Sequence, residues 1–299
     1  MPILNHLITT ILPFIPKTIV GQVAKRYIAG VRLTDGVCVA TNLNENGMMA
    51  TMDLLGEDVK SIDETEQVQN EILSILHSIR ENKLNSNVSI KPTQLGLKID
   101  KEVGYRNFKT ILDEAERLNN FIRIDMEDAT TTDGTLTMYQ RLRAEGFKNT
   151  GVAIQAYMRR SEADVHALVK DRANIRLCKG IYNEPPSIAY KERKEIQNNF
   201  LTLLRIIFEA GSYVGIATHD DYLIDGACEL IQKYGLGKEQ YEFQMLLGVR
   251  ERRRDALVKE GHRLRVYVPF GEQWYAYSTR RLKENPQMAW YITKAIFIR

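Results

Sequence analysis

Residues 213–246, YVGIATHDDYLIDGACELIQKYGLGKEQYEFQML, contain the pattern that decides the fold. Residues 213–217 and 241–246 are short runs rich in β-branched and aromatic residues, which is typical of strands. Residues 221–234 between them have helical spacing and end before Gly235. Two strands that are joined through a helix lie parallel in the same sheet. The segment therefore predicts a strand–helix–strand unit and a parallel sheet.

The same alternation runs through most of the chain. The candidate strands are Met49–Asp53, Val88–Lys91, Phe121–Asp125, Val152–Ala156, Ile175–Lys179, Tyr213–Ala217, Tyr241–Leu246 and Leu264–Val268. Their spacing of about 30 residues is that of repeated strand–helix–strand units. Eight such units favour closure into an α/β barrel, and an open, doubly wound sheet is the alternative.

Segments with helical spacing lie between the strands. We expect helices at Glu64–Asn82, at Ser161–Lys170, at Ser187–Ala210 and at Arg250–Glu260. The second of these opens with a Ser-Glu-Ala-Asp capping pattern, and the third ends at Gly211 in the C′ position.

The first 45 residues precede the first candidate strand. Apolar residues from Ile3 to Ile15 follow a helical period and form one apolar face. Asn5, Pro13 and Lys17 interrupt the segment, so it is a poor membrane span. We interpret residues 1–45 as a helical arm that docks on a barrel domain of residues 46–299; an apolar face that contacts lipid is the alternative.

Composition excludes several classes of protein. The 299 residues include 41 Lys and Arg against 38 Asp and Glu, and a net charge of +3 gives no general attraction to nucleic acid. The arginine cluster at 250–254 contains Glu251, which favours a solvated helix start over a nucleic-acid-binding module. Three distant cysteines favour a reducing compartment over a disulfide scaffold. Neither a Gly-x-Gly-x-x-Gly motif after a strand nor a Walker A sequence is present.

Polar side chains stand at the carboxyl ends of nearly all the candidate strands. They are Asp53, Lys91, Asp125, Glu127, Gln155, Arg176, Lys179, Thr218, His219, Asp220, Gln244 and Tyr267. Catalytic residues of α/β barrels lie at these ends, so the set predicts an active site. Lys91 or Lys179 allows a Schiff-base aldolase, although each lysine could instead pair with a carboxylate. His219 with Asp220 and Asp125 allows a metal hydrolase, but five histidines and no His-x-His pair make a metal site a weak alternative.

Arg280 and Arg281 follow the last strand. Guanidinium groups bind carboxylates in a planar, bidentate manner, so this pair could recognise an acidic group. The alternative is a solvated pair in which Arg280 faces Glu284 one helical turn away.

Taken together, these motifs resemble the proline dehydrogenase family. The resemblance rests on Lys91, on Ile-Asp-Met-Glu around Asp125, on Gln155 in Gln-Ala-Tyr, and on the segments 176–182 (RLCKGIY), 217–220 (ATHD), 242–246 (EFQML), 265–271 (RVYVPFG) and 277–285 (YSTRRLKEN). It implies a distorted (β/α)8, TIM-like barrel with extra N-terminal helices and a C-terminal helix over the active-site face.

The resemblance also implies an activity. Non-covalent FAD would accept a hydride at N5 from L-proline, giving 1-pyrroline-5-carboxylate in the first step of proline catabolism to glutamate. Membrane quinone would receive the electrons, and a separate pyrroline-5-carboxylate dehydrogenase would be the pathway partner. No nucleic acid and no metal are implied, and the enzyme would be cytoplasmic, placed peripherally at the inner face of the cell membrane.

Residue roles follow from the same resemblance. The implied catalytic residues are Lys91, Asp125, Arg176, Tyr267, Arg280 and Arg281. The implied proline-binding residues are Lys91, Arg280 and Arg281 at the carboxylate, with Tyr182, Leu246, Tyr267 and Tyr277 around the ring. The implied cofactor-binding residues are Asp125, Gln155, Arg176, Lys179, Gly180, Tyr182, Thr218, His219 and Glu284. In addition, Asp125 would orient Lys91, Glu284 would hold the arginine pair, and Glu57 would act as a gate.

Two positions depart from the family pattern. Ile181 stands where the family often has Ala, and Asp220 stands where it often has Asn. Asp220 would repel a flavin pyrophosphate unless its carboxylate points away. The ring of Tyr267 would crowd a 4-hydroxyl group, which favours proline over hydroxyproline.

Overall fold

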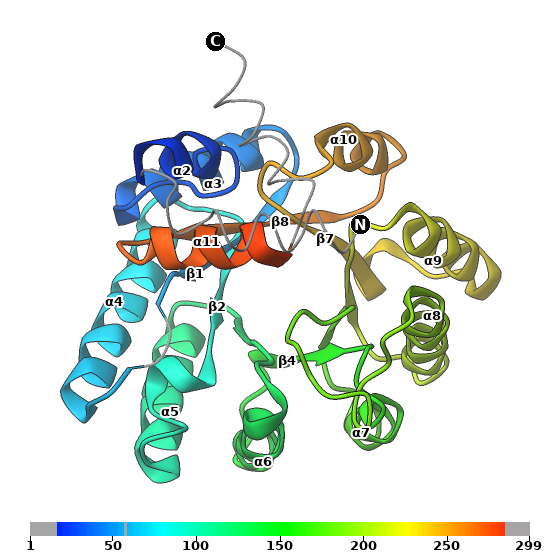
Figure 1. The fold of residues 1–299 in the computed structure, drawn as a ribbon, viewed down its shortest axis with the longest axis horizontal. Coiled ribbons are helices and arrows are strands. Elements are labelled where there is room, and N and C mark those ends of the chain that lie inside the picture. The colour runs from blue at the N-terminus through cyan, green and yellow to red at the C-terminus, as the bar shows by residue number, and fades with distance from the viewer. Residues whose placement is uncertain (1–16, 57–58, 285–299) are drawn as a thin grey trace.

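The computed structural model describes residues 17–56 and 59–284. Its sheet is a closed barrel of eight strands, each paired in parallel with its neighbours and β1 paired with β8 (Figure 1). The strands are β1 (Met49–Leu54), β2 (Ser86–Ile90), β3 (Ile122–Ile124), β4 (Thr150–Gln155), β5 (Ile175–Cys178), β6 (Val214–Ala217), β7 (Tyr241–Leu246) and β8 (Leu264–Phe270). The predicted barrel is confirmed, and the open sheet is wrong.

Helices surround the barrel and follow its strands in turn (Figure 1). They are α2 (Lys17–Ala24), α3 (Leu33–Glu45), α4 (Ile62–Glu81), α5 (Lys101–Arg117), α6 (Ala129–Ala144), α7 (Ser161–Val169), α8 (Arg193–Glu209), α9 (Asp221–Tyr234), α10 (Glu251–Lys259) and α11 (Trp274–Glu284), with the short 3₁₀ helices η2 (Pro92–Leu95) and η3 (Lys238–Gln240). The apolar faces of α3 to α10 pack on the outer face of the strands in one continuous core.

Two local predictions about helices are wrong. Ser161 is the first residue of α7 rather than its cap, because its hydroxyl donates to the Gln155 carbonyl at 2.6 Å. Helix α8 begins at Arg193, six residues after the predicted Ser187. Pro185 explains the late start, since its carbonyl accepts from the N–H of Ala189, which also forms a bridge with Met158. The predicted end of α8 is confirmed, with Gly211 at a φ of 66°.

Four strands end one residue earlier than predicted, and in two cases this places a charged site residue just outside the sheet. β2 ends at Ile90, β3 at Ile124, β4 at Gln155 and β5 at Cys178. Lys91 and Asp125 are therefore the first residues after their strands. Lys91 precedes Pro92, which begins η2, so the strand cannot continue there.

The N-terminal helices pack on both the barrel and the last helix. Ala40 and Leu43 of α3 join the main core, whereas Val20 and Ala24 of α2 form a second cluster with Tyr277 of α11. The division into an arm of residues 1–45 and a barrel of residues 46–299 stays a prediction, and the apolar face of Ile3–Ile15 lies outside the described residues. Within the described part of the chain, none of the helices has the length and apolar character that crossing a membrane requires.

The barrel interior is polar. Contacts between strands on opposite sides identify the inward-facing positions: Arg176 of β5 donates to Ser89 of β2 at 3.0 Å and reaches Asp125 beyond β3. Inward side chains recur at every second residue of a strand, as in Arg123 and Asp125. The buried polar side chains of this interior include Thr51, Asp53, Asn87, Ser89, Arg123, Arg176, Glu242 and Gln244. These groups continue to both mouths of the barrel, and the candidate site lies at the C-terminal mouth.

Candidate active site

A cavity of about 290 Å³ lies at the carboxyl ends of the strands. It brings together every site residue implied by the family resemblance whose side chain the structure describes: Lys91, Asp125, Gln155, Arg176, Lys179, Gly180, Tyr182, Thr218, His219, Leu246, Tyr267 and Tyr277. Of the other predicted strand-end residues, Gln244 also lines the cavity, whereas Asp53, Glu127 and Asp220 do not. Residues from β2 to β8 and from α11 thus converge on one space, as the rule for α/β barrels predicts.

One predicted residue is not placed, and three are placed only by their backbone. Glu57 lies outside the described residues. Arg280, Arg281 and Glu284 belong to α11, whose backbone is described as far as Glu284, but their side chains are outside the description. The same helix contributes Tyr277, which is 7% exposed and lines the cavity.

Lys91 pairs with two carboxylates. Its Nζ lies 2.7 Å from Oδ1 of Asp53 and 3.8 Å from Oδ2 of Asp125. Asp125 was predicted to orient Lys91, but Asp53 is the closer partner. Burial raises the pKa of Asp53, although the charge of Lys91 acts to lower it. The Oδ2 atom of Asp53 has no hydrogen-bond partner. The sequence predicts that Asp53 lies at a strand end, but it does not predict the contact with Lys91, which is 38 positions away.

Asp125 is the second carboxylate beside Lys91. It accepts from Ser89 at 2.6 Å, from Arg176 Nη1 at 2.5 Å and from Tyr267 at 3.0 Å. Burial opposes ionisation of Asp125, but the charges of Arg176 and Lys91 outweigh it and lower its pKa. Burial and the nearby Asp125 raise the pKa of Tyr267 well above its usual value, so its phenol stays protonated and donates.

The side-chain amide of Gln244 holds Arg176 in position. Its Nε donates to Gln244 Oε1 at 2.6 Å, and Gln244 Nε2 donates to Glu242 Oε1 at 2.6 Å. Gly215 makes room for this amide, because a Cβ there would lie 2.4 Å from Gln244 Nε2. Arg176 Nη2 is buried with no hydrogen-bond partner. The cavity therefore contains a fixed guanidinium with one donor group available to a ligand.

Comparison with known proteins assigns this arrangement. Residues 38–292 match the model of the family described as proline dehydrogenase. The chain belongs to the proline dehydrogenase family. Members of this family are oxidoreductases that act on proline, which confirms the resemblance seen in the motifs.

Curated relatives cover nearly the whole chain. Proline dehydrogenase 1 of Bacillus subtilis strain 168 is 36% identical over 273 residues, which are 91% of this chain and 90% of the relative. Proline dehydrogenase of Deinococcus radiodurans is 33% identical over 279 residues, 92% of this chain and 90% of the relative. The match therefore extends well beyond the quoted motifs.

Solved structures show the same fold. Proline utilization A of Bdellovibrio bacteriovorus, inactivated by N-propargylglycine, superposes with a TM-score of 0.83 at 24% identity. The superposition covers 93% of this chain and 34% of that protein, so this chain spans about a third of its length. The corresponding protein of Bradyrhizobium japonicum, in a D779W variant, has a TM-score of 0.76 at 16% identity and covers 89% of this chain and 32% of that one.

The departure from the family pattern at Asp220 has a local explanation. Its carboxylate accepts from the Tyr222 N–H at 3.2 Å and so caps α9, and it also accepts from Gln197 at 3.0 Å and Arg193 at 3.1 Å. Burial opposes ionisation, but Gln197 and the charges of Lys179 and Arg193 lower the pKa of Asp220. The carboxylate is thus neutralised by neighbouring groups and is not directed at the cavity as a bare charge.

The histidine and the two lysines have defined partners. His219 Nε2 accepts from the Leu246 N–H at 2.8 Å, so this nitrogen is unprotonated. Lys91 and Lys179 both pair with strand-end carboxylates, Lys179 with Asp220 at 3.7 Å, as the alternative to a Schiff base required. In the part of the chain that the structure describes, His, Cys, Asp and Glu form no group of three suited to a metal ion.

The arginine cluster of α10 faces carboxylates. Arg250 pairs with Asp221 at 2.5 Å, and Arg253 pairs with Asp225. Arg254 lies 2.8 Å from Asp255. These pairs fit the solvated helix start that the sequence favours.

Proposed function

We propose that this chain oxidises L-proline to 1-pyrroline-5-carboxylate, with non-covalent FAD as the hydride acceptor. The single observation that carries the proposal is the buried, immobilised Arg176 in the cavity of a proline dehydrogenase family member. Bound FAD would supply the hydride-accepting N5 atom. A cation held beside that atom stabilises the negative charge that arrives with the hydride.

The described residues fit a flavin. Gln155, Lys179, Thr218 and His219 come from three neighbouring strands, β4 to β6, or the loops that follow them, and all four line the cavity. Apolar and aromatic side chains line much of the rest, as a flat aromatic ring requires. Arg176 Nη2 offers a buried donor without a partner in the protein. We assign these residues, with Asp125, Gly180 and Tyr182, to the cofactor.

Proline would bind between α11 and the strand ends. Asp53 fixes Lys91 in the cavity at 2.7 Å, and we assign the Lys91 ammonium to the substrate carboxylate. Arg280 and Arg281 follow Tyr277 by three and four residues in the same helix, which brings these positions to one side of α11. We assign both arginines to the same carboxylate and Glu284 to holding them, with Glu57 as a gate.

Aromatic residues would exclude water from the ring. Tyr277 is buried and Tyr267 is half-buried, and both line the cavity with Leu246 and Tyr182. A hydride leaves only when its carbon is held in line with the acceptor, so this wall and the carboxylate clamp together orient the substrate. In this arrangement the ring of Tyr267 would crowd a 4-hydroxyl group, which favours proline over hydroxyproline.

The absorption spectrum tests the assignment. The purified chain should be yellow, with bands at roughly 380 and 450 nm, as a flavin enzyme shows. Adding L-proline without oxygen should bleach the 450 nm band. A colourless chain that takes up no FAD would overturn the proposal, and a flavin that proline does not bleach would point to another amine substrate.

We further propose membrane quinone as the electron acceptor and a separate pyrroline-5-carboxylate dehydrogenase as the next enzyme, in a cytoplasmic protein that touches the inner face of the membrane. The apolar face of Ile3–Ile15 supports this placement. A chain without residues 1–16 should reduce quinone in vesicles more slowly while keeping its rate with a soluble dye. Equal rates for both chains with vesicles would remove the N-terminal segment from this role.

A further inference from the structure

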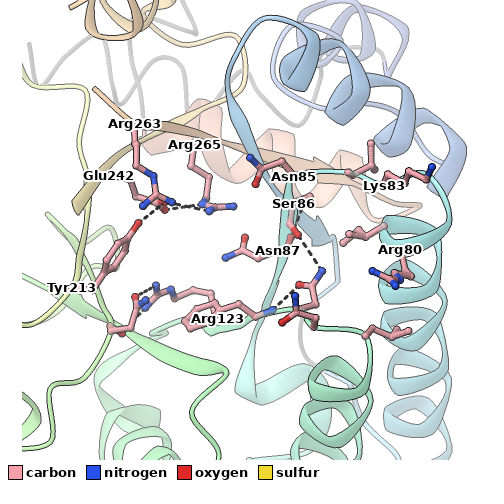
Figure 2. A pocket seen from close by; sticks show the side chains of 17 residues that line it. Arg80, Lys83, Asn85, Ser86, Asn87, Arg123, Tyr213, Glu242, Arg263 and Arg265 are labelled. Atoms are coloured by element: carbon pink, nitrogen blue, oxygen red, sulfur yellow. Dashed lines mark hydrogen bonds and ion pairs between the residues drawn. The ribbon is translucent and has the colours of Figure 1, made fainter. Parts of the chain in front are cut away.

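The opposite mouth of the barrel holds a second and larger cavity. Its volume is about 770 Å³, and it opens among the residues at the amino ends of the strands, including Ser86, Phe121, Asn174 and Arg263 (Figure 2). The proline site lies at the carboxyl ends, so none of the residues that line one cavity lines the other. The proposed activity makes no use of this space.

The charge of this cavity is unbalanced. Its cationic lining residues are Arg80, Lys83, Arg123, Arg263 and Arg265, and its one carboxylate is Glu242. Amide side chains from Asn85, Asn87 and Asn120 add neutral hydrogen-bonding groups. Figure 2 shows Arg263 and Arg265 on one side of the cavity, Arg123 on another and Arg80 with Lys83 on a third.

The single carboxylate is already neutralised. Glu242 Oε1 accepts from Arg265 Nε at 2.7 Å, and Oε2 accepts from Arg265 Nη2 at 3.1 Å and from Tyr213 at 2.7 Å. Burial opposes ionisation, but Arg265 and these donors lower the pKa of Glu242 to about 2. The negative charge of Glu242 thus balances the positive charge of Arg265, and the other cationic residues of the cavity are in excess.

Of the remaining cationic residues, Arg123 is the one that is buried without a carboxylate partner. It is 1% exposed, and within the described residues no carboxylate lies within 4 Å of its guanidinium. It donates to the Asn174 carbonyl at 2.7 Å and to the Asn174 side chain, but its Nε is buried with no partner. Burial, helped by the charge of Arg176, lowers the pKa of Arg123 to about 9. A buried cation without a counter-ion is costly, and a bound anion would offset that cost.

We propose that this cavity at the amino ends of the strands is a binding site for a small organic or inorganic anion with at least two negative charges on oxygen atoms. The buried Arg123 and the half-buried Arg263 supply guanidinium groups, and the exposed Arg80 and Lys83 add charge at the rim. Guanidinium groups bind both carboxylate and phosphate oxygens in a bidentate manner. The amide of Asn87 fits the polar remainder of such a ligand, since its Oδ1 is already used by Thr51 and its nitrogen is the group left to donate.

The test uses the full FAD-saturated chain and two probes, inorganic pyrophosphate and citrate. Titration calorimetry at low ionic strength should show saturable binding at one site for at least one probe. Pyrophosphate alone would indicate a phosphate ligand, and citrate alone would indicate a carboxylate ligand. Absence of saturable binding for both would overturn the proposal.

Three variants locate the binding. Arg263→Gln should weaken the probe about tenfold or more, because hydrogen bonds to charged groups are strong. Arg252→Gln removes one charge from an exposed position outside the cavity and should leave the affinity unchanged. Arg281→Ala should also retain binding, which separates this site from the proline carboxylate. Equal losses in Arg263→Gln and Arg252→Gln, or loss in Arg281→Ala alone, would contradict the assignment.

Discussion

The two mouths of the barrel use the same residue types and leave different charges available. At the carboxyl ends, Asp53 Oδ2 and Arg176 Nη2 are both buried without a hydrogen-bond partner. Among the described residues that line the amino-end cavity, both oxygens of Glu242 are bonded, and the buried group without a partner is Nε of Arg123. The carboxyl-end mouth thus has unsatisfied groups of both signs, whereas the amino-end mouth has surplus cations alone and suits an anion.

One amide joins the two mouths. Gln244 accepts from Arg176 with its oxygen and donates to Glu242 with its nitrogen, so its orientation is fixed by what its two neighbours can offer. The comparison therefore predicts that a change at Glu242 affects mainly stability, and that a change at Arg176 affects mainly catalysis.

The largest expected effect is on stability at the amino-end mouth. Glu242→Ala leaves Arg265 buried and without its carboxylate, which should lower the free energy of unfolding by about 3–5 kcal/mol. Urea denaturation followed by circular dichroism measures this change. Glu66→Ala, an exposed carboxylate on α4, serves as the control and should change it by less than about 0.5 kcal/mol. Similar changes in the free energy of unfolding for both variants would mean that Glu242 does not stabilise the amino-end mouth.

Arg176→Gln tests the other mouth. Loss of a preorganised cation beside the developing charge should lower kcat with L-proline by about 10²–10³-fold. Flavin content and the unfolding midpoint should be measured in parallel, because Asp125 also loses a partner. A variant that keeps its flavin and its kcat would remove Arg176 from the chemistry and leave it a structural role like that of Arg265.

Glu242 should also make stability depend on pH. Its pKa falls from 4.5 to about 2 on folding, so its contribution is complete above pH 4.5 and is lost as the pH drops towards 2. A shift of this size corresponds to about 3 kcal/mol. Glu242→Gln imitates the protonated acid, so the stability gap between wild type and variant should be about 3 kcal/mol at pH 7 and close to zero near pH 2. A gap that stays constant over this range would show that Glu242 is not ionised against Arg265.

Much of this arrangement could be predicted from the sequence, because it depends on local patterns. Eight runs of strand-forming residues, with polar residues at the carboxyl ends of nearly all of them, define the barrel and its carboxyl edge. Partner choice was harder, since Lys91 contacts Asp53 and Arg176 contacts Gln244 across 38 and 68 positions of sequence. The amino-end cavity was not predicted at all, because its arginines come from α4, β3 and the start of β8, and no motif groups them.

Arg281→Ala examines the proposed carboxylate clamp. Removing one charge-assisted contact should raise KM for L-proline by about 10–100-fold, with kcat less affected. Steady-state kinetics with a dye acceptor measure both constants. The matched control is Arg252→Ala, an exposed arginine of α10, which should alter neither. An unchanged KM would show that Arg281 does not bind the proline carboxylate. Lys91 would then remain the assigned carboxylate-binding residue whose side chain the structure describes.

The smallest expected effects come from one phenol at each mouth. Tyr267 donates to Asp125 at 3.0 Å and Tyr213 donates to Glu242 at 2.7 Å, so Phe at either position removes a single hydrogen bond worth about 1 kcal/mol. Tyr267→Phe should raise KM for L-proline by about fivefold, because Asp125 loses a donor next to the substrate. Tyr213→Phe should leave the kinetics unchanged and lower the free energy of unfolding by about 1 kcal/mol. The reverse pattern would mean that Gln244 transmits the state of the amino-end mouth to Arg176, and the two mouths would then have to be treated as one functional unit.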